Sequence, residues 1–207
     1  QQSGADSITI HLREDRRHIR DKDLKLIKKK LTIPLNLEIA PTKEMFNIAI
    51  RHKPNFICLV PEKRKEITTE GGLNLNYKKK LVKNFIRKLK NKNIRVSLFI
   101  EPSIKDVYLS KYINADCVEF HTGKICNLIN KNKPYHNSFL QLKRSVILAN
   151  KLGLEVHAGH GMTFKSAKII SNIKNIKEFN IGHFIIGESI FFGLKRVINK
   201  FKIILKK

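Results

Sequence analysis

The chain has 207 residues, 42% of them hydrophobic, which is enough for one sizeable core. No apolar run approaches the roughly 18 residues that a membrane span needs, so we expect no membrane association. The three cysteines, Cys58, Cys117 and Cys126, form no C-x-x-C pair, which favours free thiols and a cytoplasmic location over a disulfide framework.

The charge is strongly positive: 42 Lys and Arg against 17 Asp and Glu give a formal net charge of +25. The lysines are spread over every predicted helix, and stacking aromatic residues are not interleaved among them. This pattern argues against a nucleic-acid surface. An excess of Lys, Asn and Ile together is typical of an AT-rich coding genome, which is the favoured explanation. The second explanation of the positive charge is attraction of phosphorylated substrates, and the third is binding of a polyanion.

The first predicted strand, residues 7–13, alternates aliphatic and polar side chains and runs into the charged block EDRRH. Alternation of period two places His11 and Arg13 on one face of this strand. Asp21 is predicted to cap the helix that follows. The second strand carries Glu38 among Ile, Pro and Leu, and Thr42 begins the next helix.

Seven strands are predicted in all, and each is followed by a helix. They cover approximately residues 7–13, 33–40, 55–61, 94–100, 116–121, 154–160 and 179–187. The last strand, FNIGHFIIG, is followed by one amphipathic helix that bears Ile190, Leu194, Val197, Ile198 and Phe201.

Strict alternation of strands and helices demands parallel pairing, as in an open doubly wound sheet or a closed barrel. No G-x-G-x-x-G opens the first helix, which weakens the dinucleotide-binding version of the open sheet. Reactive side chains gather at the carboxyl ends of the strands, and these ends converge at the mouth of a barrel. We therefore predict a single (β/α)8 TIM-barrel domain over residues 1–207, whose missing first strand would precede Gln1.

His11, Arg13 and His18 are candidates for an anion-binding catalytic pocket, because Arg donates two parallel hydrogen bonds to a phosphate. The neighbouring charged residues, Glu14, Asp15, Arg16 and Arg17, are better explained as part of a solvent-exposed turn between strand and helix. Partial burial of Glu38 is expected to raise its pKa into the range of a general base, with a structural salt bridge as the alternative. Glu119 has the same geometry, and structural and functional roles are equally supported.

Further candidates lie in the later loops. Gly161 beside His160 suggests close approach of the backbone to a ligand, and Gly182-His183 suggests an anion site at a helix start. His157 and His160 lack further ligands at any usual spacing, so no metal is expected. Thr68 lies in the loop EKRKEITTEGG, which suits a flap over a ligand or is an ordinary exposed loop.

The motifs HLREDRRHI, NLE, LVPEKR, TTEGG, VSLFI, EFHTG, AGHG and NIGHFIIG occur in this order along the whole chain. In this set the sequence resembles the pyridoxine 5'-phosphate synthase family of vitamin B6 biosynthesis. That resemblance implies a β/α barrel with extra helices, assembled as a homo-oligomer (an octamer in the family). It implies condensation of 1-deoxy-D-xylulose 5-phosphate with 3-amino-2-oxopropyl phosphate by acid/base catalysis, releasing phosphate and water without a cofactor.

The resemblance also implies residue roles. Glu38 and His11 would accept protons, His160 would donate one, and Glu119 would stabilise a cationic transition state. The substrate-binding residues would be Arg13, His18 and Thr68 for the deoxyxylulose phosphate, and Gly161, Gly182 and His183 for the aminoketone phosphate.

Two departures from the family pattern stand out. The family's Asn-x-Asp-His first strand would precede Gln1, and His157 stands where the family usually has Asn. The alternatives are an N-terminally truncated homologue with weak or no activity, another phosphosugar barrel isomerase or aldolase with Lys63 as Schiff base, and a basic nucleic-acid binder.

Overall fold

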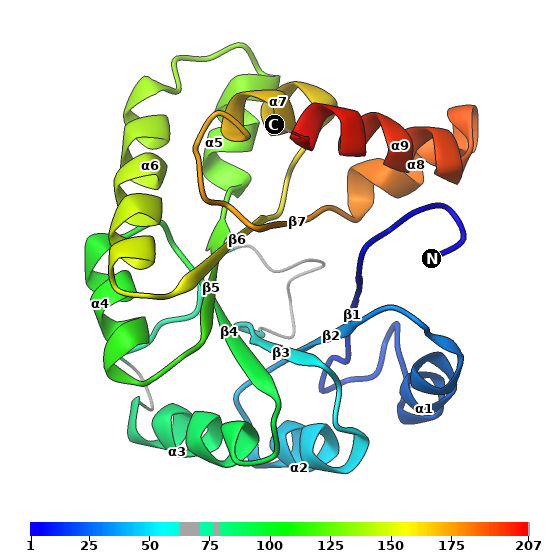
Figure 1. The fold of residues 1–207 in the computed structure, drawn as a ribbon, viewed down its shortest axis with the longest axis vertical. Coiled ribbons are helices and arrows are strands. Elements are labelled where there is room, and N and C mark those ends of the chain that lie inside the picture. Colours follow the sequence, from blue (N-terminus) through cyan, green and yellow to red (C-terminus); the bar gives the residue numbers. More distant parts are fainter. Residues whose placement is uncertain (63–70, 77–78, 207) are drawn as a thin grey trace.

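A computed structural model of the chain describes residues 1–62, 71–76 and 79–206. Its parallel sheet pairs in chain order through β1 (Ile8–His11), β2 (Leu35–Ile39), β3 (Phe56–Leu59), β4 (Arg95–Ile100), β5 (Cys117–His121), β6 (Glu155–Gly159) and β7 (Glu178–Asn180). The strands form a nearly closed ring with helices around its outside (Figure 1). The predicted β/α barrel is confirmed.

The helices alternate with the strands along the chain. They are α1 (Asp21–Lys30), α2 (Lys43–His52), α3 (Lys79–Lys90), α4 (Ile104–Tyr112), α5 (Gly123–Asn130), α6 (His136–Lys151), α7 (Phe164–Ile170), α8 (His183–Phe192) and α9 (Leu194–Leu205). None of the helices in the described part of the chain has the length and apolar character needed to cross a bilayer.

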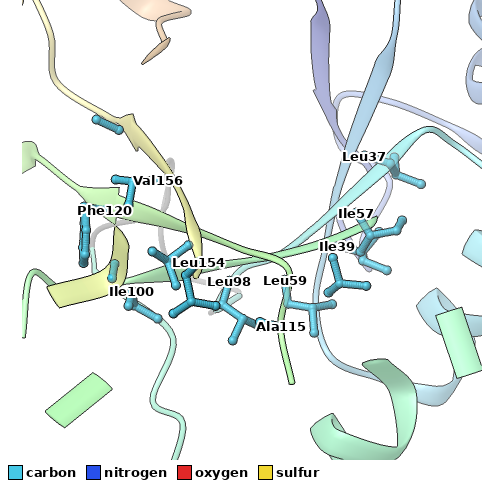
Figure 2. Close-up of a cluster of buried hydrophobic side chains, with 14 of the residues drawn as sticks. Leu37, Ile39, Ile57, Leu59, Leu98, Ile100, Ala115, Phe120, Leu154 and Val156 are labelled. Atoms are coloured by element: carbon cyan, nitrogen blue, oxygen red, sulfur yellow. The ribbon is translucent and has the colours of Figure 1, made fainter. Parts of the chain in front are cut away.

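The hydrophobic core lies between the strands and the helices. In β2 to β6 every second strand residue, including Leu37, Leu98, Phe120 and Val156, is buried against the helices (Figure 2). Burial of this aliphatic layer is the main favourable contribution to folding, at about 25 cal/mol per Å² of apolar surface.

The other face of each strand points into the ring and is mostly polar. Residues paired in register on neighbouring parallel strands share a face, which groups Thr9, His11, Asn36, Glu38, Cys58, Ser97, Phe99, Cys117, Glu119, His121, Glu155, His157, Gly159, Glu178 and Asn180. Cys58, Val60 and Phe99 form a small apolar cluster of their own, separate from the outer core. The ring therefore has a dry outer layer and a polar interior.

Side chains connect the first and last strands. In the described part of the chain the backbone ladder runs from β1 to β7 and does not continue from β7 to β1. The Thr9 hydroxyl donates to Asn180 Oδ1 (3.0 Å) and accepts from Asn36 Nδ2 (3.3 Å). The Thr9–Asn180 bond joins β1 to β7, where strand pairing is absent, and the bond from Asn36 connects the same hydroxyl to β2.

The predicted strand over residues 179–187 was wrong in its second half. The strand ends at Asn180, and His183 begins α8, with Gly182 as its N-cap. A short apolar run such as FIIG has no period that separates strand from helix. The single helix predicted after it is also wrong: Gly193, at φ 78°, separates α8 from α9.

Other corrections are smaller. β1 ends at His11, so Leu12 and Arg13 lie beyond the strand predicted over 7–13. The N-cap of α1 is Arg20, not Asp21, and the Asp23 carboxylate accepts from the Arg20 amide (3.0 Å). Helix α5 was not predicted. Thr42 does cap α2, accepting from the Met45 amide at 3.4 Å.

Candidate active site

His11 and Glu38 lie side by side because β1 and β2 pair with these two residues in register. His11 Nδ1 is 3.7 Å from Glu38 Oε2, and His11 Nε2 is 3.8 Å from Glu62 Oε2, just beyond β3. Both distances exceed that of a hydrogen bond, so the imidazole sits between two carboxyl groups without being locked to either. This spacing suits a group that must exchange a proton with a third molecule.

Burial shifts the pKa values of this pair in opposite directions. It raises the pKa of Glu38 from 4.5 to about 7. It also lowers the pKa of His11 from 6.5 to about 4, helped by the charges of Arg13 and His18 and opposed by Asp15. Near neutral pH the imidazole is therefore unprotonated, while the carboxyl can both take up and release a proton.

Arg13 and His18 lie in the turn after β1. Arg13 is buried, and its Nε is 3.6 Å from both Glu62 Oε1 and Asp15 Oδ1. Glu62 also accepts from the Glu14 amide (2.9 Å), so this carboxylate holds the turn against the end of β3. His18 is exposed. The charges of Arg13 and His18 both lower the pKa of His11, which places the two residues near it.

Glu119 lies deeper in the ring. Its Oε2 accepts from Asn180 Nδ2 (2.8 Å) on β7, and Cys58 Sγ on β3 donates to the same oxygen at 3.8 Å. Burial, followed by the charge of Glu38, raises the pKa of Glu119 well above its ordinary value. A Cβ on Gly159 would lie 2.0 Å from Glu119 Oε1, so glycine leaves the space that this carboxyl occupies.

His160 follows β6 and has the unusual φ of 78°, as does Gly161. The Thr122 hydroxyl at the end of β5 donates to the carbonyls of Gly159 (2.7 Å) and His160 (2.8 Å), which holds this turn. Burial lowers the pKa of His160, and the charges of His121 and His183 lower it further. His183, at the exposed N-terminus of α8 beside Gly182, is thus close enough to affect His160.

Because all seven strands run parallel, their carboxyl ends lie at one mouth of the ring, and this topology directs the candidate residues to that mouth. They are His11, Arg13, Glu38, Glu119, His160 and His183, with Gly161 and Gly182 next to the last two in sequence. Thr68 and Lys63 lie outside the described residues. Sequence reasoning missed Thr9, Asn36, Cys58 and Asn180. Their partners lie on other strands, and several are across the ring, so spacing along one strand carries no signal for them.

A second polar cluster lies at the opposite ends of the strands. Ligand atoms of Cys117, Glu155 and His157 lie within 4.8 Å of one another. The Arg95 guanidinium is already inserted there, with Nη2 at 3.1 Å from Glu155 Oε2 and 3.3 Å from Cys117 Sγ. Because this positive charge would repel a cation, the cluster is better explained as an ion pair at the amino ends of the strands. His157 belongs to it through Glu155 (2.9 Å).

A parallel β/α ring with acid/base side chains at the carboxyl ends of its strands defines the class of β/α-barrel enzymes. Within that class, the family described as "Pyridoxal phosphate biosynthesis protein PdxJ" matches residues 1–207. The chain belongs to this family, whose members are ring-closing condensing enzymes of pyridoxine biosynthesis.

Individual relatives agree. The chain is 58% identical over 204 residues to the pyridoxine 5'-phosphate synthase of Pelagibacter ubique, covering 99% of this chain and 85% of the relative. It is 46% identical to the enzyme of the same name from Zymomonas mobilis, covering 98% and 78%. For the enzyme of that name from Aquifex aeolicus the identity is 45%, covering 100% and 87%.

Solved structures agree on the fold alone. The 3-hexulose-6-phosphate synthase of Salmonella typhimurium superposes with a TM-score of 0.68 at 12% identity, covering 97% of this chain and 86% of that protein. Phosphoribosyl anthranilate isomerase of Thermotoga maritima gives 0.62 at 11% identity, covering 99% and 89%.

Proposed function

We propose that this chain condenses 1-deoxy-D-xylulose 5-phosphate with 3-amino-2-oxopropyl phosphate to form pyridoxine 5'-phosphate, phosphate and water. The observation that carries the proposal is the His11–Glu38 pair, at 3.7 Å and with pKa values shifted in opposite directions. Imine formation, dehydration and ring closure are successive proton transfers. Such a sequence needs several acid/base groups with different pKa values in one site.

Each side chain has a proposed role in this sequence. Neutral His11 and ionised Glu38 accept protons. His160 donates one. Burial and the charges of His121 and His183 lower its pKa, so it must first take up a proton released in an earlier step, and its imidazolium then gives that proton up readily. Glu119 points into the ring and stabilises positive charge that develops on the substrate nitrogen. Burial raises its pKa, and the developing cation lowers it again, so the substrate charge itself favours the ionised form of Glu119.

The phosphate groups have separate proposed sites. Arg13 and His18 supply positive charge after β1 for the deoxyxylulose phosphate. Gly161, Gly182 and His183 supply backbone amides and an imidazole near the start of α8 for the aminoketone phosphate, where the helix dipole favours an anion. Thr68 is proposed for the first phosphate on resemblance alone.

The test is to incubate the purified chain with both substrates and follow release of inorganic phosphate and formation of the pyridine ring by 31P NMR and ultraviolet absorbance. We expect both products together, and a fall of at least about 100-fold in kcat for Glu38→Gln. Glu155→Gln, at the far end of the ring, is the matched control and should keep activity. An inactive wild-type chain would favour the degraded homologue, and trapping of a covalent adduct by borohydride would favour an aldolase.

We also propose that the protein acts in the cytoplasm as a homo-oligomer. Support comes from α8 and α9, where Ile190, Phe191 and Ile203 are 74–80% exposed. Contiguous apolar side chains of this kind mark contact surfaces. Light scattering should give a multiple of the chain mass, which Phe191→Glu should lower; a monomer at assay concentrations would contradict the proposal.

A further inference from the structure

Glu101 and His121 form a hydrogen-bonded pair beside the candidate site. Glu101 follows β4 and His121 ends β5, and His121 Nδ1 is 2.8 Å from Glu101 Oε1. The same oxygen accepts from the Gly72 amide at 2.9 Å. The hydrogen bond from His121 lowers the pKa of Glu101 despite partial burial. An ionised carboxylate only accepts hydrogen bonds, so Nδ1 of His121 carries the proton.

The other nitrogen of His121 faces the His160 side. His121 is 8% exposed, and its Nε2 has no hydrogen-bond partner among the described residues. A Cβ on Gly123 would lie 2.6 Å from this Nε2 and 2.9 Å from His160 Cδ2. Both rings therefore pack over the same glycine, and no other residue leaves room for them.

The two imidazoles are in direct contact. Their ring centroids are 4.9 Å apart with an angle of 53° between the planes. Phe99 packs edge-on against His121 at 5.3 Å, so the His121 ring is held between the Glu101 carboxylate, Phe99 and His160.

The backbone of His160 also needs support. A positive φ in a non-glycine residue is energetically unfavourable and persists only where the surroundings impose it. Thr122, the residue after His121, provides this support through its hydroxyl bonds to the carbonyls of Gly159 and His160. The segment 121–123 thus fixes both the ring and the backbone of His160.

We propose that Glu101 and His121 are positioning residues that hold the His160 imidazole in the orientation for proton transfer. Glu101 fixes the tautomer and plane of the His121 ring, and His121 packs against the His160 ring. This inference rests on the proposed role of His160. The chain contains a matched comparison, because His157 has the same kind of partner in Glu155, at 2.9 Å, in the cluster at the far end of the ring.

The experiment compares Glu101→Ala, Glu101→Gln, His121→Asn and the control Glu155→Ala. Loss of the acceptor in Glu101→Ala should lower kcat roughly tenfold or more, because small misplacements of a reacting group are costly, and should change KM little. Glu101→Gln should recover most of the loss, since its amide oxygen accepts the same hydrogen bond. Glu155→Ala should leave kcat unchanged.

A second readout does not need activity. The His160 imidazole can be titrated by NMR in the full chain, with its resonances assigned from His160→Gln. His121→Asn removes the ring that contacts the His160 imidazole at 4.9 Å and that, when protonated, lowers the pKa of His160. The midpoint should therefore move upward, and Glu155→Ala should leave it in place. Unchanged kcat in Glu101→Ala, or an unmoved His160 titration in His121→Asn, would overturn the proposal. If wild-type protein is inactive while the titration moves as expected, the proposed function fails and the positioning stands.

Discussion

Burial acts on Glu38 and His11 in opposite senses, although the two side chains are neighbours. The carboxyl is charged only after losing its proton, whereas the imidazole is charged only after gaining one. A dry site therefore favours the neutral form of both. As a result, His11 is ready to accept a proton at pH 7, and Glu38 titrates close to that pH.

Glu38→Gln should change stability as well as activity. The raised pKa means that the folded state binds this proton more tightly than the unfolded state. The contribution to stability is full below about pH 4.5 and is lost as pH rises through about 7. The free energy of unfolding of Glu38→Gln should therefore exceed that of wild type by about 3 kcal/mol at pH 8.

Urea denaturation of both proteins at pH 4 and pH 8 measures this difference. The gap between variant and wild type should be wider at pH 8 than at pH 4. An equal gap at both pH values would mean that burial does not hold the proton on Glu38.

Gly159→Ala should damage the site more than the fold. The new Cβ would meet Glu119 Oε1 at 2.0 Å, and the carboxyl would have to leave its hydrogen bond with Asn180. Thermal denaturation should show a loss of about 1–3 kcal/mol, and steady-state assay should show a fall in kcat with little change in KM.

Gly187→Ala is the control for that substitution. No atom lies within 4 Å of a Cβ at Gly187, and the residue is inside α8. Alanine there should raise stability by up to about 1 kcal/mol, because glycine is a poor helix former. Equal kcat values for the two alanine variants would refute the close packing of Glu119 on Gly159.

The candidate site was predictable where residue type and strand position agree. Four polar residues lie on otherwise apolar strands or just after them: His11, Glu38, Glu119 and His160. Burying such groups is unfavourable unless they are paired, so a functional role is a natural explanation for their presence. The partners of Glu119 were not predictable, because Cys58 and Asn180 meet it only after the ring forms. Periodicity assigns a residue to a face of its own strand and gives no information on contacts across the barrel.

At the scale of elements, helix boundaries were predictable only where the sequence carries a recognisable capping residue or an amphipathic pattern. Thr42 and Thr163 are N-caps with side-chain hydrogen bonds, and the sequence predicted that Thr42 begins its helix. The run after Gly182 is apolar on all sides and leaves α8 without a buried residue, so the usual amphipathic signal is absent. Helix α5 begins directly after β5, without the loop that normally marks a boundary.

The contact between β1 and β7 depends on one hydroxyl group. Thr9→Val keeps the shape of the side chain but leaves Asn180 Oδ1 without its donor and Asn36 Nδ2 without its acceptor. We expect a loss of about 1 kcal/mol in the free energy of unfolding, because Asn36 is buried while Thr9 and Asn180 are half-buried. Urea denaturation measures it.

Thr9→Ser is the control, because it retains the hydroxyl and removes only a methyl group. If the Val variant were as stable as the Ser variant, the side-chain bridge would contribute nothing to closing the ring.

At the scale of the whole molecule, the formal net charge of +25 exceeds what the site needs. Charges spread over the outer helices act on a ligand before it binds. If they serve the reaction, they do so by drawing the two phosphorylated substrates of the proposed function toward the mouth. If the charge only reflects composition, the approach of substrate gains nothing from it.

Ionic strength separates these cases. The screening length falls from about 30 Å at 0.01 M salt to about 8 Å at 0.15 M. Steering should therefore make kcat/KM fall about tenfold over this range. Because proton transfer occurs within a dry site that salt screens weakly, kcat should stay constant. If kcat/KM does not change with salt concentration, the excess of lysine only reflects the composition of the sequence and does not assist substrate binding. A parallel fall of kcat would instead mean that salt disturbs the ion pairs of Arg13 within the site.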